Sequence, residues 1–165
     1  MITDFEKALA VLTEEGVEFI VVGGVAASLH GSPRSTLDLD IVYRRTRENL
    51  KRVANCLARH SPYLRGAPPG LPFRWDFATI RNGLNFTLDT AFGDLDLLGE
   101  VAGGGAYDDL LPHSVEVSGF GCRFRIVKLE KLIELKRAAG RVKDLEVLAE
   151  LQLILRRRRD TGQKD

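Results

Sequence analysis

The sequence is poor in cysteine and contains no long apolar run. Its two cysteines, Cys56 and Cys122, lie far apart without Cys-x-x-Cys spacing, so neither a disulfide framework nor a zinc–cysteine site is predicted. No segment approaches the roughly 18–20 apolar residues of a membrane-spanning helix, and the N-terminus lacks the basic and apolar regions of a signal peptide. These absences predict a cytoplasmic protein with reduced thiols and no membrane partner.

The chain also lacks an excess of charge of either sign. Its 165 residues include 24 lysines and arginines and 23 acidic residues, with 44% hydrophobic and 28% charged residues. This composition excludes disordered and fibrous classes and a uniformly basic nucleic-acid binder, but not a local basic patch. The length suits one domain with a real core, so we expect a single domain over residues 1–155 and a basic, frayed tail over 156–165.

The most informative segment runs from residue 19 to residue 43. The apolar, β-branched residues 19–22 predict a strand that ends on Gly23-Gly24, where the missing Cβ atoms permit a tight turn. The short segment 25–30 is helix-permissive, so its first amides can point outward as a phosphate site. Gly31 ends that helix, and residues 36–42 then alternate as a second strand.

Two carboxylates lie on one face of that second strand. Asp38 and Asp40 are two residues apart, which places their Cα atoms roughly 6–7 Å apart in an extended chain. This spacing suits a pair of divalent ions about 3.5–4 Å apart. The alternative is that the two side chains are merely the solvated face of a half-covered sheet.

At these residues the chain resembles the nucleotidyltransferase superfamily with a DNA polymerase β-like catalytic core. The resemblance is to the pattern Gly-Gly, short helix, Gly, Arg-x-Thr-x-Asp-x-Asp, and it is carried by Gly23, Gly24, Gly31, Arg34, Thr36, Asp38 and Asp40. Many members have Gly-Ser in place of Gly-Gly; the Gly-Gly form looks like the branch of small bacterial proteins that includes AbiEii-type toxins. The resemblance implies an α/β fold with a mixed central β-sheet and packed helices.

The resemblance also implies a third carboxylate from a neighbouring strand. The segment Gly93-x-Leu95-Asp96-Leu97-Leu98 resembles the family's third motif, and we assign the third carboxylate to Asp96. Asp94 is the competing assignment, because it shares a strand face with Asp96 under the two-residue period.

A lysine occupies an apolar position of a later helix. Leu129, Leu132 and Ile133 begin a helical face whose next member is Lys136. The lysine either extends along its alkyl stem to water or reaches the triphosphate. The segment from residue 135 to 145 resembles the terminal helical motif of AbiEii-type proteins, which favours the second role. On an apolar face, replacing Lys136 with Met would keep or raise stability. Asp144 in the same segment is equally compatible with a purely structural role at a helix N-terminus.

The remaining segments supply simpler expectations. Thr3 to Glu6 has capping-box spacing before a helix that ends at Gly16, and Thr46 can cap another helix. We expect a loop over 61–72, a hairpin of strands 73–80 and 84–90 across Asn82-Gly83, and a strand pair over 114–118 and 122–127. The final helix is expected to bury a stripe formed by Leu145, Leu148, Leu151 and Leu155.

The function implied by the resemblance is metal-dependent transfer of an NMP from an NTP, such as ATP, to an acceptor hydroxyl. Asp38, Asp40 and Asp96 would hold Mg²⁺, with two ions expected, and Gly23, Gly24, Arg34, Thr36 and Lys136 would bind the nucleotide, with Lys136 also acting in catalysis. The acceptor is RNA or tRNA, a protein or a small molecule, and Arg156–Arg159 and the basic residues 44–52 suggest RNA. The same resemblance suggests a toxin with an antitoxin partner; the rival interpretation is an inactive member that binds a nucleotide or a partner.

Overall fold

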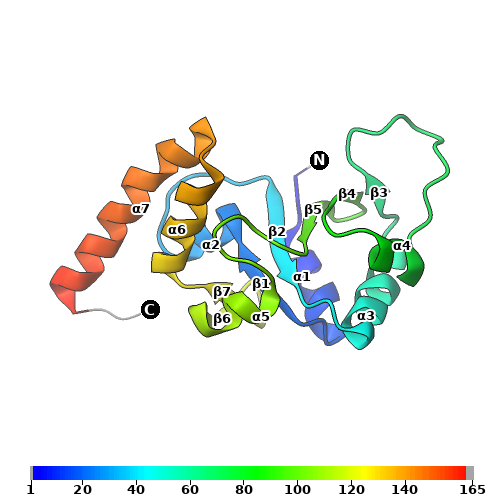
Figure 1. The fold of residues 1–165 in the computed structure, drawn as a ribbon, viewed down its shortest axis with the longest axis horizontal. Coiled ribbons are helices and arrows are strands. Elements are labelled where there is room, and N and C mark those ends of the chain that lie inside the picture. Colours follow the sequence, from blue (N-terminus) through cyan, green and yellow to red (C-terminus); the bar gives the residue numbers. More distant parts are fainter. Residues whose placement is uncertain (1, 163–165) are drawn as a thin grey trace.

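The structure is a computed structural model that describes residues 2–162 around a mixed seven-stranded sheet (Figure 1). The strand order is β3-β4-β5-β2-β1-β7-β6. The strands are β1 (Phe19–Val22), β2 (Asp38–Tyr43), β3 (Tyr63–Leu64), β4 (Phe86–Thr90), β5 (Gly93–Leu98), β6 (Ser114–Gly119) and β7 (Cys122–Val127). The neighbours β2 and β5, and β1 and β7, run parallel, whereas the other neighbours are antiparallel. The predicted α/β fold with a mixed central sheet is confirmed.

Helices pack around this sheet, four of them at its two ends. They are α1 (Phe5–Glu14), α2 (Gly23–Leu29), α3 (Arg47–Ala58), α4 (Phe77–Asn82), α5 (Tyr107–Leu110), α6 (Leu129–Ala139) and α7 (Val142–Thr161), with a 3₁₀ turn at Leu111–His113. In Figure 1, α6 and α7 lie beside each other at one end and α3 and α4 lie at the other. Within residues 2–162, no helix combines the length and apolar character needed to cross a bilayer.

Alternation along β2 and β5 separates the core from the polar face. Leu39 and Ile41 of β2, and Leu95 and Leu97 of β5, are completely buried. The aspartates between them point to the opposite face, as the two-residue period of a strand requires. The apolar partners therefore fix which way the carboxylates face, because a one-residue slip would bury the charges.

The N-terminus is capped by a different residue from the one the sequence predicts. Asp4 is the N-cap of α1, where its side chain accepts a hydrogen bond from the Lys7 amide at 3.0 Å. Thr3 instead donates from its hydroxyl to the Leu37 carbonyl at 2.5 Å and accepts from the Asp94 amide at 2.9 Å. The predicted Thr3 cap is wrong because that hydroxyl joins the starts of β2 and β5.

The predicted hairpin across Asn82-Gly83 is also wrong. Residues 77–82 form α4, with Asp76 as its N-cap, and Gly83 follows its last residue. The hairpin instead joins β4 to β5, which pair from Phe86↔Leu97 to Thr90↔Gly93. Within the segment 61–72, which is otherwise a loop as expected, Tyr63–Leu64 adds a short edge strand.

Helix α7 differs from its prediction in burial and in length. Only Leu151 of the predicted stripe is completely buried; Leu148 and Leu155 are partly buried, and Leu145 is 53% exposed. Where the sequence led us to expect a frayed tail from Arg156, the helix continues to Thr161 and ends at Gly162 in the left-handed conformation. The last part of the expected tail, residues 163–165, lies outside the described residues.

Candidate active site

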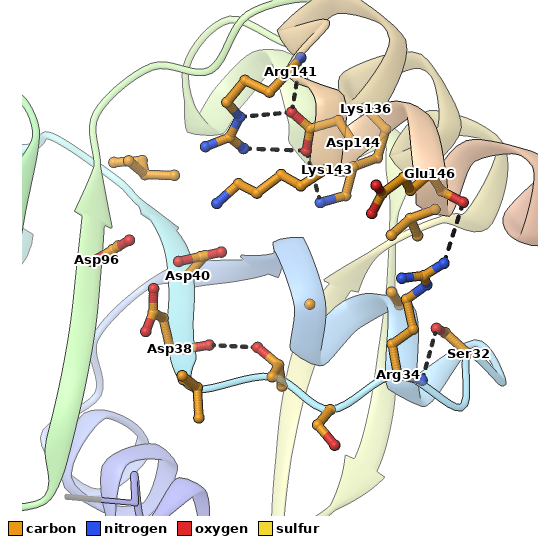
Figure 2. A pocket seen from close by; sticks show the side chains of 17 residues that line it. Ser32, Arg34, Asp38, Asp40, Asp96, Lys136, Arg141, Lys143, Asp144 and Glu146 are labelled. Atoms are coloured by element: carbon orange, nitrogen blue, oxygen red, sulfur yellow. Dashed lines mark hydrogen bonds and ion pairs between the residues drawn. The ribbon is translucent and has the colours of Figure 1, made fainter.

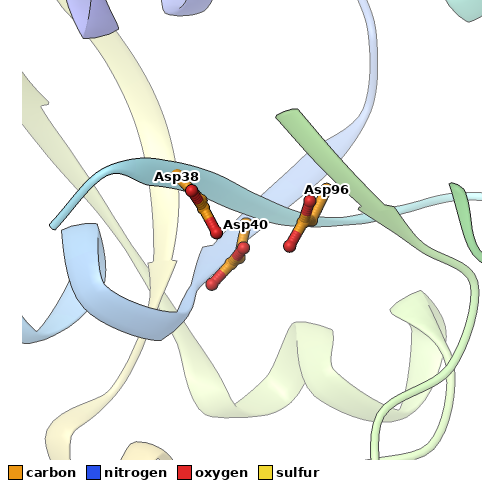
Figure 3. A group of neighbouring side chains, drawn as sticks. All are labelled: Asp38, Asp40 and Asp96. Atoms are coloured by element: carbon orange, nitrogen blue, oxygen red, sulfur yellow. The ribbon is translucent and has the colours of Figure 1, made fainter. Parts of the chain in front are cut away.

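Three carboxylates from β2 and β5 meet on the polar face of the sheet (Figure 3). The parallel register places Asp40 opposite Asp96, and Asp38 precedes Asp40 by two residues on the same face. One oxygen from each side chain lies within 4.8 Å of the other two. The parallel pairing of two strands that are far apart in the chain thus builds the cluster.

Asp94 lies next to this cluster but does not complete it. It pairs across the sheet with Asp38 rather than with Asp40. Burial raises the pKa of Asp94, although the neighbouring Arg65 opposes that shift. The geometry therefore favours Asp96 over Asp94 as the third carboxylate.

Among the described residues, Asp40 is the member of the cluster that no basic side chain contacts as an ion pair, whereas Arg65 contacts Asp38 and Asp96. The Oδ1 atom of Asp40 is buried and accepts no hydrogen bond from residues 2–162. Burial, followed by the charges of Asp96 and Asp38, raises the pKa of Asp40 to about 8, and only Lys136 opposes the shift. An unpartnered carboxylate oxygen among like charges is unfavourable unless a cation binds there.

The cluster fits a hard divalent cation. Carboxylate oxygens are the ligands that Mg²⁺ and similar ions take, and three of them converge here around a buried, unpartnered oxygen. Asp38, Asp40 and Asp96 are therefore compatible with divalent-metal binding.

Gly23 and Gly24 are the first residues of α2, two residues earlier than predicted, and two side chains approach their backbone closely. Gly23 has φ +66°, and a Cβ at this position would overlap Oδ2 of Asp40. A Cβ on Gly24 would lie 2.5 Å from Oγ1 of Thr36. The two glycines thus let the start of α2 sit directly against β2, beside the carboxylates.

Lys136 forms part of an ion network, centred on the buried Asp144, above the carboxylates (Figure 2). Its Nζ lies 3.3 Å from Oδ1 of Asp144, whose side chain is completely buried, and Nε of Arg141 lies 2.6 Å from Oδ2 of the same residue. Burial by itself would raise the pKa of Asp144, but hydrogen bonds and charge from Arg141 and Lys136 hold it below its usual range. Asp144 therefore fixes two cations close to Asp40.

Arg34 and Thr36 both line the same pocket, but the Arg34 guanidinium is engaged elsewhere. Its Nε lies 3.0 Å from Oε2 of Glu150 on α7, and the guanidinium is about half exposed. A hydrogen bond from Ser32, and then Arg34, lower the pKa of Glu150. Thr36 donates to the Asp38 carbonyl at 3.2 Å, which fixes the entry into β2.

The pocket above the three carboxylates has a volume of about 520 Å³. It brings together all the predicted site residues except Gly23, which borders an adjoining hollow at Asp40. Its walls also contain Arg141 and Lys143, which the predicted set omits, and Lys143 extends toward the carboxylates in Figure 2. Acidic and basic side chains thus face each other across this pocket.

Arg65 contacts the carboxylates but was not predicted from the sequence as a site residue. Arg65 follows the edge strand β3 in the Pro- and Gly-rich segment, and its guanidinium lies 2.9 Å from Asp96. Neither periodicity nor a motif identifies it, because its position depends on the pairing of β3 with β4.

Comparison with known proteins bears on the fold. No family model matches the chain, and no curated protein matches it. Among solved structures, it resembles one from Thermotoga maritima described as a "putative nucleotidyltransferase", with a TM-score of 0.53 and 18% sequence identity over 91% of this chain and 94% of the other. The chain has a nucleotidyltransferase-like fold. At this level of identity the likeness concerns the fold, so activity has to be argued from the acidic site.

Proposed function

We propose that this protein is a metal-dependent nucleotidyltransferase that moves an NMP from an NTP to an acceptor hydroxyl. The observation that carries the proposal is the convergence of Asp38, Asp40 and Asp96 beneath a cation-lined pocket, on a nucleotidyltransferase-like fold. The sheet that carries these residues runs through most of the described chain, so we also propose one domain.

The proposed reaction forms one bond to the α-phosphorus and breaks one. The acceptor oxygen attacks the α-phosphorus, the bond to the β-phosphate oxygen breaks, pyrophosphate leaves, and the acceptor proton passes to solvent. Mg²⁺ held by the three aspartates, with two ions proposed, would neutralise phosphate charge and activate the hydroxyl. Lys136 would neutralise charge on the leaving phosphates, because Asp144 holds its ammonium near Asp40.

The positions of the other predicted nucleotide-binding residues suggest a role for each. Gly23 and Gly24 would bind phosphate through their backbone amides, and their missing Cβ atoms let Asp40 and Thr36 pack against the start of α2. Thr36 would also hold the adjoining strand entry. Arg34 would bind phosphate by exchanging Glu150, which is feasible because the ion pair is half exposed.

An adjoining hollow offers a place for the nucleoside. It has a volume of about 240 Å³, shares Asp40 and Lys136 with the main pocket, and has apolar walls from Leu98, Leu132 and Leu135. Apolar walls beside a polar cluster are typical of small-molecule sites. We place the NTP base on this side of the carboxylates.

For the acceptor we favour RNA or tRNA over a protein or small molecule. Arg47, Lys51 and Arg81 lie 5.4, 5.9 and 5.6 Å from the ring centre of Phe77, and among the described residues no carboxylate lies within 4.0 Å of these three cations. Unpaired cations around an aromatic ring suit a nucleic-acid backbone. In the C-terminal arginine run, by contrast, Arg159 already pairs with Glu130 at 3.4 Å.

A toxin of the AbiEii type, neutralised by an antitoxin, is the biological setting that we propose. The alternative function is a catalytically inactive module that binds a nucleotide or a partner. The presence of all three carboxylates favours turnover over that alternative.

The direct test is label transfer. The protein is incubated with each α-³²P-labelled NTP, Mg²⁺ and either total cell RNA or cell protein, and we expect label in the RNA fraction. Asp38→Asn should abolish transfer, because it removes one ligand of the cluster, while Asp108→Asn, an exposed acid outside the cluster, should not. Nucleotide binding without label in any fraction would favour the inactive module, and label in protein would change the acceptor.

Lys136→Met is expected to weaken nucleotide binding by about tenfold or more and to lower stability modestly. Helix periodicity alone predicted that this substitution would keep or raise stability. The structure reverses that prediction, because Asp144 is buried and, without Lys136, would have Arg141 as its one remaining cationic partner. Losing one of two partners should destabilise by about 1–2 kcal/mol, less than the ~3–5 kcal/mol of a fully broken buried pair. Thermal melting with and without Mg²⁺ and NTP measures both effects.

Lys131→Met is the matched control for that substitution. Lys131 lies on the same helix, its side chain is as buried as that of Lys136, and its Nζ lies 3.0 Å from Glu134 outside the pocket. It should leave the nucleotide-induced shift in melting temperature unchanged. Equal shifts in wild type and Lys136→Met would remove Lys136 from the site.

A further inference from the structure

A single guanidinium contacts four carboxylates on the polar face of the sheet. Distances from Arg65 are 2.9 Å from Nη2 to Asp96, 3.7 Å from Nη1 to Asp38, 3.5 Å from Nε to Asp94 and 3.4 Å from Nε to Asp89. The side chain is 23% exposed. Arg65 is therefore in direct contact with two of the three aspartates to which we assign metal binding.

The sheet register explains why a cation is needed there. Asp89 of β4 pairs with Asp94 of β5, and Asp94 pairs with Asp38 of β2, so three like charges lie in one row across three strands. Like charges directly opposite each other destabilise a sheet. Arg65 reaches across this row from the edge, and in the metal-free protein it offsets that repulsion.

Charge, rather than directional bonding, holds the guanidinium at the carboxylates. Within residues 2–162 the only hydrogen bond from its side chain is to the Leu88 carbonyl, at 2.7 Å, and none of the four carboxylate contacts has hydrogen-bond geometry. A divalent ion on Asp38, Asp40 and Asp96 would place two positive charges beside the guanidinium. The two cations would then compete for Asp96.

We propose that Arg65 is a tethered counter-ion that occupies the metal side of the site and leaves Asp96 when a divalent ion binds. The inference rests on the proposed metal-dependent function, which it deepens by naming the residue that sets metal affinity. Metal binding is thereby coupled to the chain that follows Arg65.

The structure of the chain after Arg65 allows this segment to respond to metal binding. Only a short stretch of β3 holds Arg65, whose amide donates to the Thr87 carbonyl at 2.9 Å, and the chain then runs through an exposed loop to α4 (Figure 1). The single tryptophan of the chain, Trp75, lies at the end of this loop, with its ring 5.5 Å from that of Phe86. Its fluorescence therefore reports on this segment.

The test measures Mg²⁺ affinity by calorimetry, at a pH above 8 so that protons do not compete at Asp40, together with hydrogen exchange of residues 66–72 and Trp75 fluorescence. Arg65→Met should tighten Mg²⁺ binding about tenfold, the size expected for removing one charge close to a divalent ion. In wild type, Mg²⁺ should speed exchange in the loop and change the fluorescence. In Arg65→Met, exchange should already be fast and respond little.

Two control variants test whether the change in Mg²⁺ affinity comes from the charge of Arg65. Arg65→Lys retains the charge and should bind Mg²⁺ nearly as wild type does. Arg74→Met removes an exposed guanidinium from the same loop, 4.0 Å from Asp76 and away from the site, and should change nothing. If wild type binds Mg²⁺ and Arg65→Met binds it equally or more weakly, the counter-ion role is overturned while the metal site stands. If neither protein binds Mg²⁺, both the inference and the metal-dependent function fall.

Discussion

Asp40→Asn is expected to abolish divalent-metal binding and, in the metal-free protein, to raise the melting temperature. The Asp40 carboxylate has a buried, unpartnered oxygen between two like charges, so ionising it is unfavourable until a metal binds. Asparagine removes that charge while nearly keeping the shape. We expect a gain of about 1 kcal/mol or more near neutral pH, which is roughly 3 °C for a chain of this length.

The gain should depend on pH in a defined direction. The pKa of Asp40 rises from 3.8 to about 8 in the folded protein, mainly through burial, so the folded state holds a proton that the unfolded state has lost. The contribution of the Asp40 carboxyl to the stability of wild type is fully present below about pH 4 and is lost as the pH rises through 8. The advantage of Asp40→Asn should therefore grow from pH 4 and level off above pH 8, as followed by thermal melting across that range.

Asp89→Asn is the control, because Asp89 lies on the same sheet face but outside the metal cluster and is about half exposed. It should shift the melting temperature less and leave Mg²⁺ binding in place. A Mg²⁺-induced shift that survives in Asp40→Asn, or an advantage that does not vary with pH, would contradict the assignment.

Gly23→Ala is expected to damage both the fold and the site. The added Cβ would overlap Oδ2 of Asp40, and the φ of +66° is itself strained for alanine. Relieving the overlap must displace either α2 or the Asp40 carboxylate. We expect a loss of about 2–4 kcal/mol in the free energy of unfolding, together with the loss of Mg²⁺ binding.

Gly16→Ala separates the effect of the steric overlap from the effect of the backbone strain. Gly16 has φ +77°, but a Cβ there would meet nothing within 4 Å. Its replacement should therefore cost only the backbone strain, about 1 kcal/mol, and leave Mg²⁺ binding unchanged. Chemical denaturation of both variants measures the difference, and similar losses in the two would show that Gly23 serves only backbone conformation.

Local patterns were sufficient where a segment's neighbours in sequence decide its structure. The local pattern predicts a strand pair over 114–118 and 122–127, and the helical spacing after Phe5 predicts α1; β6, β7 and α1 are present. The Asn82-Gly83 signal failed because Asp76 caps a helix ahead of it and a Cβ on Gly83 would meet the ring of Phe86. At this position a close tertiary approach, rather than a hairpin turn, explains the glycine.

The sequence by itself determined the change of chain direction at Gly23-Gly24 and the placement of Asp38 and Asp40 on one face, because these follow from the freedom of a glycine and the period of a strand. The mixed α/β class was implied by the resemblance to nucleotidyltransferases rather than by a local pattern. Only the tertiary structure decided that Asp96 rather than Asp94 faces Asp40, since this depends on the register between β2 and β5. The same holds for Lys136, which pairs with Asp144, and for Arg65, which reaches the carboxylates from an edge strand. Contacts between charged side chains on different strands and helices depend on long-range packing, which no periodic pattern along the chain predicts.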